Sequence, residues 1–554
     1  MKIDSSLPVL RVIWGGTEHS VSYVPGRSVR DILDSTEMRV VSACGGVGAC
    51  GRCLVALEEG EANPVTAAES VHLSIDEIRQ GLRLACQLIP QGNVCIHVRC
   101  PAPISSWKTP QDDDFTPALI TLDPTAGLYP GQGYGVAIDV GTTHLRVTVW
   151  DLVIGRRLAS RTGPNPQAAF GADVLMRLAT ARESVEKTEQ LSQLLRNALG
   201  DALRDIFNRE FEDAEAAKKQ ITELLVVGNP PMLALLSARN VSALLEPENW
   251  TRKIDYQPED TASWRRCWGI TAECHIELVP PLAGFVGADL LAGVVATGLT
   301  EACGGALLID VGTNIEVALW DGQQLWVTST PGGPAFEGSG LSCGLPAETG
   351  AIAKAWLTSP DQELAVDVIG GGSAKGVCGS GLVDIVACLR RTGIVNSGGR
   401  FINTAPGQAF LVSEQENNIQ IKAGDIDALQ RAKAGLAAAT VYLLQQAGMV
   451  PNDLQRICVS GAFGSYLDVV NAQSIGLLPE VLPERVELYT NTALAGCEQL
   501  LFLPERTVLL EQITAESKLI NMSLASEFEE LFINNLWLRP IQMPKKQSVT
   551  NLLR

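Results

Sequence analysis

The stretch CGGVGACGRC, residues 44–53, decides the fold of the first part of this chain. Cys44, Cys50 and Cys53 follow the spacing C-x5-C-x2-C, and Cys86 follows far downstream. Three thiolates on one tight loop and a fourth from a distant turn can close around two irons, which indicates a [2Fe–2S] cluster. Glycine is frequent because the backbone must wrap the cluster closely and point N–H groups at sulfur. We therefore expect the chain to handle single electrons.

The residues around this loop predict a β-grasp ferredoxin domain over residues 1–100. Residues 9–14 and 20–23 are strand-like and meet across Gly15-Gly16, and further strands are expected at 53–57 and 94–98. Ser28 is expected to cap a short helix, and Ser74 with Glu77 forms a capping box for another. The ten other cysteines are predicted to be mostly small core residues.

Residues 101–133 predict a linker, because six prolines and a run of three aspartates at 112–114 punctuate them. A hinge in this linker would let the ferredoxin domain swing between a donor and an acceptor of electrons.

Bulk composition excludes several classes of protein. The chain has 554 residues, enough for three or four domains, with 46% hydrophobic and 19% charged residues. Its net charge of −19, without a basic run, argues against a nucleic-acid partner. The apolar segment 281–299 contains Asp289 and several glycines, so we expect a buried loop and helix rather than a membrane span. Fourteen cysteines without an export signal favour the cytoplasm.

An internal repeat organises the rest of the chain. The sequence IDVGTT at 138–143 is echoed by IDVGTN at 309–314, and each copy follows an apolar strand and continues into a second strand. Two such units predict a duplicated α/β fold with a nucleotide cleft between its lobes, one at residues 134–300 and the other at 301–515. Residues 516–554 are expected to form a partly disordered tail.

The turn of each repeat suits phosphate binding. Glycine lets backbone N–H groups approach phosphate oxygens, and neighbouring hydroxyls add donors. The residues predicted to bind nucleotide are Gly141, Thr142 and Thr143 in the first turn and Gly312, Thr313 and Asn314 in the second. Asp139 and Asp310, one before each turn, are predicted to be the catalytic pair that holds Mg²⁺ against the phosphates.

A third element completes this prediction. Residues 457–460 form a strand that leads into GAFGS, residues 461–465, where Gly461 and Gly464 would permit close packing against an adenosine. The order of two phosphate hairpins and a late adenosine turn resembles the actin, sugar kinase and Hsp70 superfamily (ASKHA), whose lobes are RNase-H-like.

A ferredoxin domain joined to an ASKHA body resembles one family closely, the reductive activators of corrinoid enzymes. Residues 9 to about 500 carry the resemblance in order, and the signature stretches are 227–229, 284–289, 333–338, 376–382 and 461–464. The resemblance implies an ATP-dependent reductase that returns the Co(II) corrinoid of a partner methyltransferase system to Co(I). A plant-type [2Fe–2S] cluster has a potential near about −400 mV, so ATP would drive an uphill transfer.

The resemblance also implies partners and some departures. None of the five histidines lies in an Asp-x-His-x-x-Gly segment, so the corrinoid is expected on the partner protein. An upstream donor, which the sequence does not identify, would reduce the cluster. The sequence leaves open whether the protein forms a homodimer. Pro230-Pro231 stand after Asn229 where the family has threonines, and His144 is expected to be a strand residue. Glu316 and Glu337 are candidates for a general base by position only.

Three alternatives remain open from the residues. The chain could be an ATP-driven electron injector for another low-potential enzyme. It could be a redox sensor that binds ATP without coupled turnover. It could also be a sugar kinase fused to a ferredoxin domain. Hydrolysis that depends on a Co(II) partner would separate an injector from a sensor, and phosphorylation of a hydroxyl substrate would identify a kinase.

Overall fold

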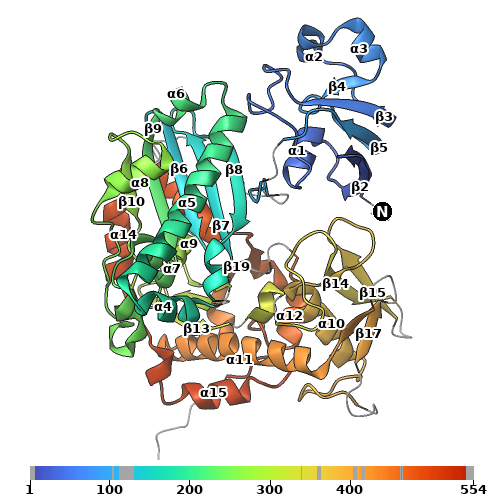
Figure 1. Cartoon of the computed structure of the whole chain (residues 1–554). Coiled ribbons are helices and arrows are strands. Elements are labelled where there is room, and N and C mark those ends of the chain that lie inside the picture. The colour runs from blue at the N-terminus through green and yellow to red at the C-terminus, as the bar shows by residue number, and fades with distance from the viewer. Residues whose placement is uncertain are drawn as a thin grey trace, which may run out of the picture. The chain divides into compact units, whose positions relative to one another are not determined.

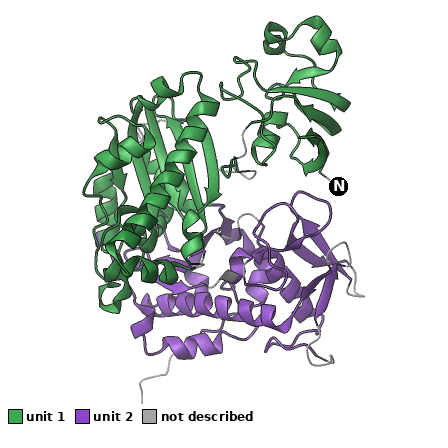
Figure 2. Ribbon diagram, viewed as in Figure 1, with its two compact units in different colours: residues 1–297, 491–514 green, residues 298–490, 515–554 purple. Residues whose placement is uncertain are grey.

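The computed structural model (Figure 1) describes residues 7–102, 105–110, 130–171, 173–312, 314–332, 334–338, 340–358, 363–402, 409–413, 418–461, 463 and 466–543. The chain divides into two compact units (Figure 2). Unit 1 comprises Met1–Thr297 and Asn491–Thr514, and unit 2 comprises Gly298–Thr490 and Ala515–Arg554.

The first part of unit 1 is the predicted β-grasp ferredoxin domain. Its sheet has the order β2-β1-β5-β3-β4, with β1 parallel to β5 and antiparallel to β2. The strands are β1 (Val9–Trp14), β2 (Thr17–Ser22), β3 (Leu54–Ala62), β4 (Leu82–Leu84) and β5 (Pro90–Val98).

Side-chain caps start all three short helices of this domain. Ser28 caps α1 (Val29–Asp34), as predicted, by accepting a hydrogen bond from the Asp31 N–H. The predicted capping box of Ser74 and Glu77 starts α3 (Ile75–Arg79). A second capping box, not singled out from the sequence, starts α2 (Ala67–His72).

Part of the predicted linker is buried. Residues 103–104 and 111–129, including the three aspartates, lie outside the described residues. Within 105–110, Trp107 is only 4% exposed, and Lys108 exchanges backbone hydrogen bonds with Thr162. The ring of Trp107 lies where a side chain on Gly163 would be, 2.7 Å from its ideal Cβ. Trp107 and Lys108 therefore pack against β8, so this part of the segment is not the fully solvated linker that was predicted.

The second part of unit 1 is the lobe that contains the first repeat. Its sheet has the order β10-β9-β6-β7-β8. The antiparallel meander β6 (Tyr134–Val140), β7 (His144–Asp151) and β8 (Arg156–Pro164) is extended by β9 (Ile221–Gly228) parallel to β6 and β10 (His275–Leu278) parallel to β9.

Helices cover this sheet. The long helix α5 (Val185–Glu210) packs on β7 and β8, and α9 (Ala288–Thr297) and α13 (Thr492–Leu501) pack on each other and on β9 (Figure 1). The other helices are α4 (Val174–Arg182), α6 (Ala214–Lys218), α7 (Pro230–Ser237), α8 (Thr261–Trp268) and α14 (Arg506–Ala515). Since β6 is buried at six consecutive residues, both of its faces are covered.

Unit 2 repeats this arrangement and confirms the duplicated lobes. Its main sheet has the order β20-β19-β11-β12-β13-β21, with β11–β13 antiparallel, β19 parallel to β11 and β20 parallel to β19. The strands are β11 (Gly305–Val311), β12 (Asn314–Trp320), β13 (Leu325–Pro331), β19 (Leu454–Gly461), β20 (Val486–Leu488) and β21 (Ser517–Leu519). The first five match β6–β10 in order and direction.

Among the residues of unit 2 that the structure describes, two smaller sheets and four α-helices complete the fold. The small sheets are built from β14 (Ala351–Leu357), β15 (Leu364–Val368) and β16 (Gly376–Val377), and from β17 (Phe410–Ser413) and β18 (Ile419–Ile421). The helices are α10 (Gly379–Arg391), α11 (Ala423–Gln446), α12 (Val469–Ser474) and α15 (Phe528–Asn534).

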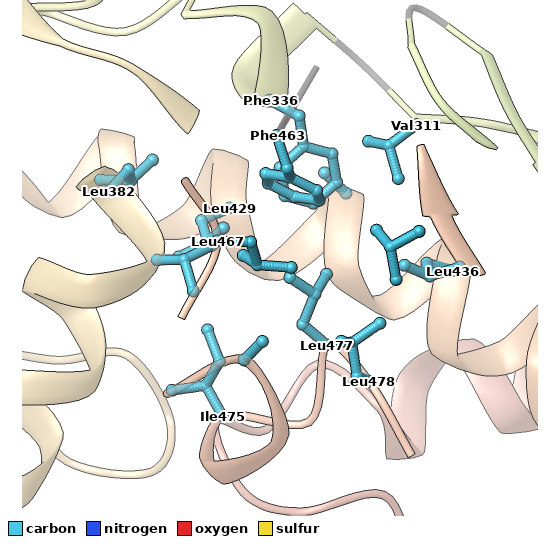
Figure 3. Close-up of a cluster of buried hydrophobic side chains, with 14 of the residues drawn as sticks. Val311, Phe336, Leu382, Leu429, Leu436, Phe463, Leu467, Ile475, Leu477 and Leu478 are labelled. Atoms are coloured by element: carbon cyan, nitrogen blue, oxygen red, sulfur yellow. The ribbon is translucent and has the colours of Figure 1, made fainter. Parts of the chain in front are cut away.

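The core of unit 2 reaches the predicted nucleotide turns. Phe336 and Phe463 pack edge to face, with ring centroids 4.9 Å apart, among leucines from several elements (Figure 3). Both rings are about 1% exposed. Because Phe463 belongs to the predicted adenosine turn, core packing positions that turn.

The units are bounded differently from the predicted lobes. Residues 491–514, expected in the second lobe, group with unit 1 because α13 packs on α9 and β6. The tail groups with unit 2, where β21 pairs with β13 and the side chains of Leu531 and Leu538 are buried. Residues 544–554 lie outside the described residues.

The apolar segment 281–299 contains α9. In the part of the chain that the structure describes, no helix is both long enough and apolar enough to cross a membrane.

Candidate cluster site and nucleotide hairpins

The four predicted ligand thiols lie as two pairs. The thiol of Cys44 is hydrogen-bonded to that of Cys50, and the thiol of Cys53 to that of Cys86. Cys50 also lies near enough to Cys53 for its charge to raise the Cys53 pKa. Among the described residues, no group of three or more His, Cys, Asp or Glu side chains is assembled as a metal site. Two pairs suit two irons with two thiolates each.

Backbone N–H groups point at these sulfurs, as a cluster loop requires. Burial raises the pKa of the Cys44 thiol, but hydrogen bonds from the Cys50 N–H and thiol and from the Ala49 and Gly48 N–H groups outweigh it and lower the pKa. The hydrogen bond from Cys53 is the main cause that lowers the pKa of Cys86 to about 7. In each pair the thiol that accepts the hydrogen bond, Cys44 or Cys86, is therefore the more acidic one, whereas the pKa values of Cys50 and Cys53 are raised.

Two glycines of the loop have no room for a side chain. Gly46 and Gly48 have positive φ values of +84° and +82°. A Cβ on Gly46 would lie 3.0 Å from Arg30 Nη1, and one on Gly48 would lie 2.8 Å from Ala68 Cβ in α2. These close approaches explain the glycines of the loop better than flexibility does.

The first phosphate hairpin joins β6 to β7 in unit 1. The Gly141 N–H donates to the His144 carbonyl at 3.1 Å, and a Cβ on Gly141 would lie 2.5 Å from that oxygen. Thr142 is buried, and its hydroxyl accepts from Asn229 Nδ2 at 3.1 Å, so this hydroxyl supports the turn itself. Thr143 is exposed. Of the two predicted hydroxyls, Thr143 is therefore the one accessible to a phosphate.

Asp139, at the end of β6, has two polar partners. Its Oδ2 accepts from Arg146 at 3.1 Å and from Asn491 Nδ2 at 2.8 Å, and the residue is 5% exposed. His144 is half-buried, and burial, followed by the charge of Arg146, lowers its pKa to about 4. His144 is the first residue of β7, as expected from the sequence.

Several residues that shape this hairpin were missed in the sequence. Asn165 Nδ2 donates to the Gly141 carbonyl at 2.9 Å, and Arg177 donates to the Thr142 carbonyl at 2.7 Å. Asn229 and Asn491 cap α7 and α13. An asparagine before a helix is a recognisable N-cap signal. The sequence does not reveal that the same side chains also donate to Thr142 and Asp139.

The second hairpin, in unit 2, lies beside the predicted adenosine turn. Asp310 on β11 faces Ser460 on the parallel strand β19. Gly461 has φ +93°, and a Cβ there would lie 2.1 Å from the Val311 carbonyl and 2.7 Å from Asp310 Oδ1. The glycine is therefore required for contact between these strand ends. Thr313 and Gly464 lie outside the described residues.

Carboxylates gather at the second hairpin. Glu316 on β12 is 5% exposed and pairs in register with Asp310. Glu337 Oε1 lies 3.7 Å from the ideal Cβ position of Gly312, and Asn314 is the first residue of β12. Three carboxylates thus lie near this hairpin, and carboxylate oxygens are the ligands that Mg²⁺ prefers in proteins.

Comparisons with known protein families define the class of the chain. Residues 12–91 match a 2Fe-2S iron-sulfur cluster binding domain, 134–302 the RACo middle region, and 305–550 the C-terminal domain of RACo, the ASKHA domain. The chain is thus a [2Fe–2S] ferredoxin domain fused to an ASKHA body that binds ATP.

Whole-chain relatives agree with that class. The chain is 28% identical to the corrinoid activation enzyme RamQ of Eubacterium limosum, over 95% of this chain and 98% of RamQ. It is 26% identical to a Methanosarcina barkeri reductase of the Co(II) methylated amine-specific corrinoid protein, over 73% and 76% of the two chains. The solved structure of a reductive activator for corrinoid, iron-sulfur protein has the same fold, with TM-score 0.63, 24% identity and coverage of 96% and 99%. The chain belongs to the reductive activators of corrinoid enzymes.

Proposed function

We propose that this chain is an ATP-dependent reductive activator that passes one electron from a [2Fe–2S] cluster to the Co(II) corrinoid of a partner protein, restoring Co(I). One observation carries the proposal. The same chain contains four paired thiols surrounded by backbone N–H groups and two equivalent hairpins that each begin at an aspartate.

The thiol pairs suggest how the cluster is held. Cys44 and Cys50 would bind one iron, and Cys53 and Cys86 the other. When bound, the cluster supplies a single electron at low potential. The N–H groups of Gly48 and Ala49 would stabilise negative charge on the sulfurs.

The hairpins suggest how ATP is used. Asp310, supported by the neighbouring carboxylates, would hold Mg²⁺. Asp139 would orient the cation or its waters while Thr143 donates to a phosphate. Gly461, packed against Val311 and Asp310, would bring the end of β19 close to the adenosine. No described carboxylate is assigned as a general base, since Mg²⁺ and the two aspartates can position the attacking water.

ATP gives direction to a transfer that would otherwise be unfavourable. Each 59 mV of uphill potential lowers a one-electron equilibrium constant about tenfold. Binding and hydrolysis can offset this only through different affinities for two states of the protein. The relatives act on corrinoid proteins, so a corrinoid protein is the proposed acceptor. We place the reaction in the reducing cytoplasm, with an upstream donor that reloads the cluster.

The deciding experiment mixes the reconstituted, reduced protein with Mg-ATP and a Co(II) corrinoid protein under anaerobic conditions. We expect the absorbance of Co(I) to appear with ATP and to stay absent without nucleotide. Equal yields of Co(I) with and without ATP would contradict the proposal, and so would a protein that binds no iron.

A further inference from the structure

A network of buried charges joins the ferredoxin part of unit 1 to the C-terminal end of α5. Arg30 Nη2 donates to both carboxylate oxygens of Glu210, at 2.7 and 2.6 Å, and both side chains are only 6% exposed. Arg39 makes a bidentate pair with Asp205 at 2.9 and 2.7 Å. These contacts link α1 and the residues after it to the last turns of a helix about 170 residues later.

Further residues close the network. Arg161, on β8, donates to Asp205 at 2.7 Å and to Glu210 at 2.6 Å. Arg209 donates to Asp34 at 2.5 Å. The network holds four arginines and three carboxylates, which leaves one net positive charge in a buried region. Charges in such a region are poorly screened by solvent and act over longer distances than surface charges.

The network touches the cluster loop itself. Arg30 Nη1 lies 3.0 Å from the ideal Cβ of Gly46, and that position is 3.8 Å from Cys86 Cβ. The Arg30 N–H also donates to the Ala85 carbonyl at 2.9 Å, one residue before Cys86. On the other side, the ideal Cβ of Gly45 is 3.2 Å from the Glu210 carbonyl oxygen and 3.6 Å from Glu210 Oε2. One cation and one anion therefore flank the same loop.

We propose that Arg30 and Glu210 are positioning residues that dock the cluster loop on α5 and set the reduction potential of the bound cluster with opposite signs. Reduction adds one negative charge to the cluster. Arg30 stabilises that charge and raises the potential, whereas Glu210 opposes it and lowers the potential. The proposal rests on the cluster half of the proposed function and needs neither ATP nor the corrinoid partner.

The test is a dye-mediated redox titration of the reconstituted full-length protein, followed by electron paramagnetic resonance without nucleotide. Arg30→Gln should lower the equilibrium constant for reduction at least tenfold, or 59 mV for one electron, and Glu210→Gln should raise it. Arg79→Gln is the matched control, because Arg79 is 75% exposed and pairs with Asp76 on the surface of α3. It should leave the potential unchanged.

Opposite signs separate charge tuning from loss of structure. Shifts of the same sign, or no shift in either variant, would overturn the proposal. If Arg30→Gln fails to bind a cluster, Arg30→Lys keeps the charge and should stay within threefold of the wild-type equilibrium constant. A larger shift in Arg30→Lys would also overturn the proposal. If the reduction potential shifts as expected in both variants but the protein does not reduce cobalt, the proposed function would be contradicted and this proposal would stand.

Discussion

At the scale of residues, the two equivalent aspartates have different surroundings. Asp139 is paired with Arg146 and Asn491, so a guanidinium already balances its charge. Asp310 faces Glu316 across the hairpin and lies against Gly461. The neighbour across the hairpin is therefore an arginine for Asp139 and a glutamate for Asp310. The same sequence, IDVGT, thus has two electrostatic settings.

The proposed role of Asp310 as a cation ligand predicts how the substitution Asp310→Asn affects activity. We expect loss of ATP-dependent cobalt reduction by about a hundredfold or more, because a principal cation ligand is removed. The visible spectrum of the cluster should not change. Asp427→Asn is the control, since Asp427 is exposed and pairs with Arg431 one turn along α11. Loss of the cluster spectrum in Asp310→Asn would show that the nucleotide site is misassigned.

At the scale of elements, α11 anchors the C-terminal tail through a buried lysine. Lys433 is 0% exposed, and its Nζ donates to the Asn535 and Trp537 carbonyls at 2.6 and 2.8 Å. Burial, and then the charge of Arg539, lower the pKa of Lys433 from 10.5 to about 7. Folding therefore shifts the equilibrium of this amine toward its neutral form, which predominates only above about pH 7.

The lowered pKa of Lys433 predicts that the stability of the protein depends on pH. Between pH 7 and 10.5 the unfolded chain binds a proton at Lys433 that the folded chain lacks, so the free energy of unfolding rises with pH, by at most about 5 kcal/mol. Lys433→Met should remove this rise, and Lys354→Met, at an exposed position of β14, should keep it. Melting temperatures at pH 7 and 9.5 measure the effect. An unchanged pH dependence in Lys433→Met would contradict the assignment.

At the scale of the whole molecule, the two units share one strand order. The order and direction of β10-β9-β6-β7-β8 recur in β20-β19-β11-β12-β13, and in both sheets the aspartate is the next-to-last residue of β6 or β11. Each unit keeps its own core, and the late helices α13 and α14 return to the first unit. Duplication thus supplies two phosphate-type turns from one folding pattern.

Both turns should contribute to ATP binding in the intact protein. Mg-ATP at about 100 times its Kd should add about 2.7 kcal/mol to the free energy of unfolding and raise the melting temperature by a few degrees. Asp139→Asn and Asp310→Asn should each reduce this rise, as thermal melts with and without Mg-ATP would reveal. A full rise in either variant would exclude that aspartate from the site.

The local parts of this protein follow from its sequence. Cysteine spacing predicts the cluster loop, the repeat at 138–143 and 309–314 predicts the matching sheets, and the capping box of Ser74 and Glu77 predicts a helix start. These features can be predicted from the sequence because each depends on residues close together in the chain or on a repeated pattern.

Only the tertiary structure decides which distant groups meet. Arg30 meets Glu210 across 180 residues, and Asn491 meets Asp139 across 352. It also decides that residues 491–514 pack with unit 1 and that Trp107 of the predicted linker is buried. Such contacts depend on the path of the whole chain, because charge and hydrogen-bonding capacity in a sequence do not specify which of many partners a fold brings within reach.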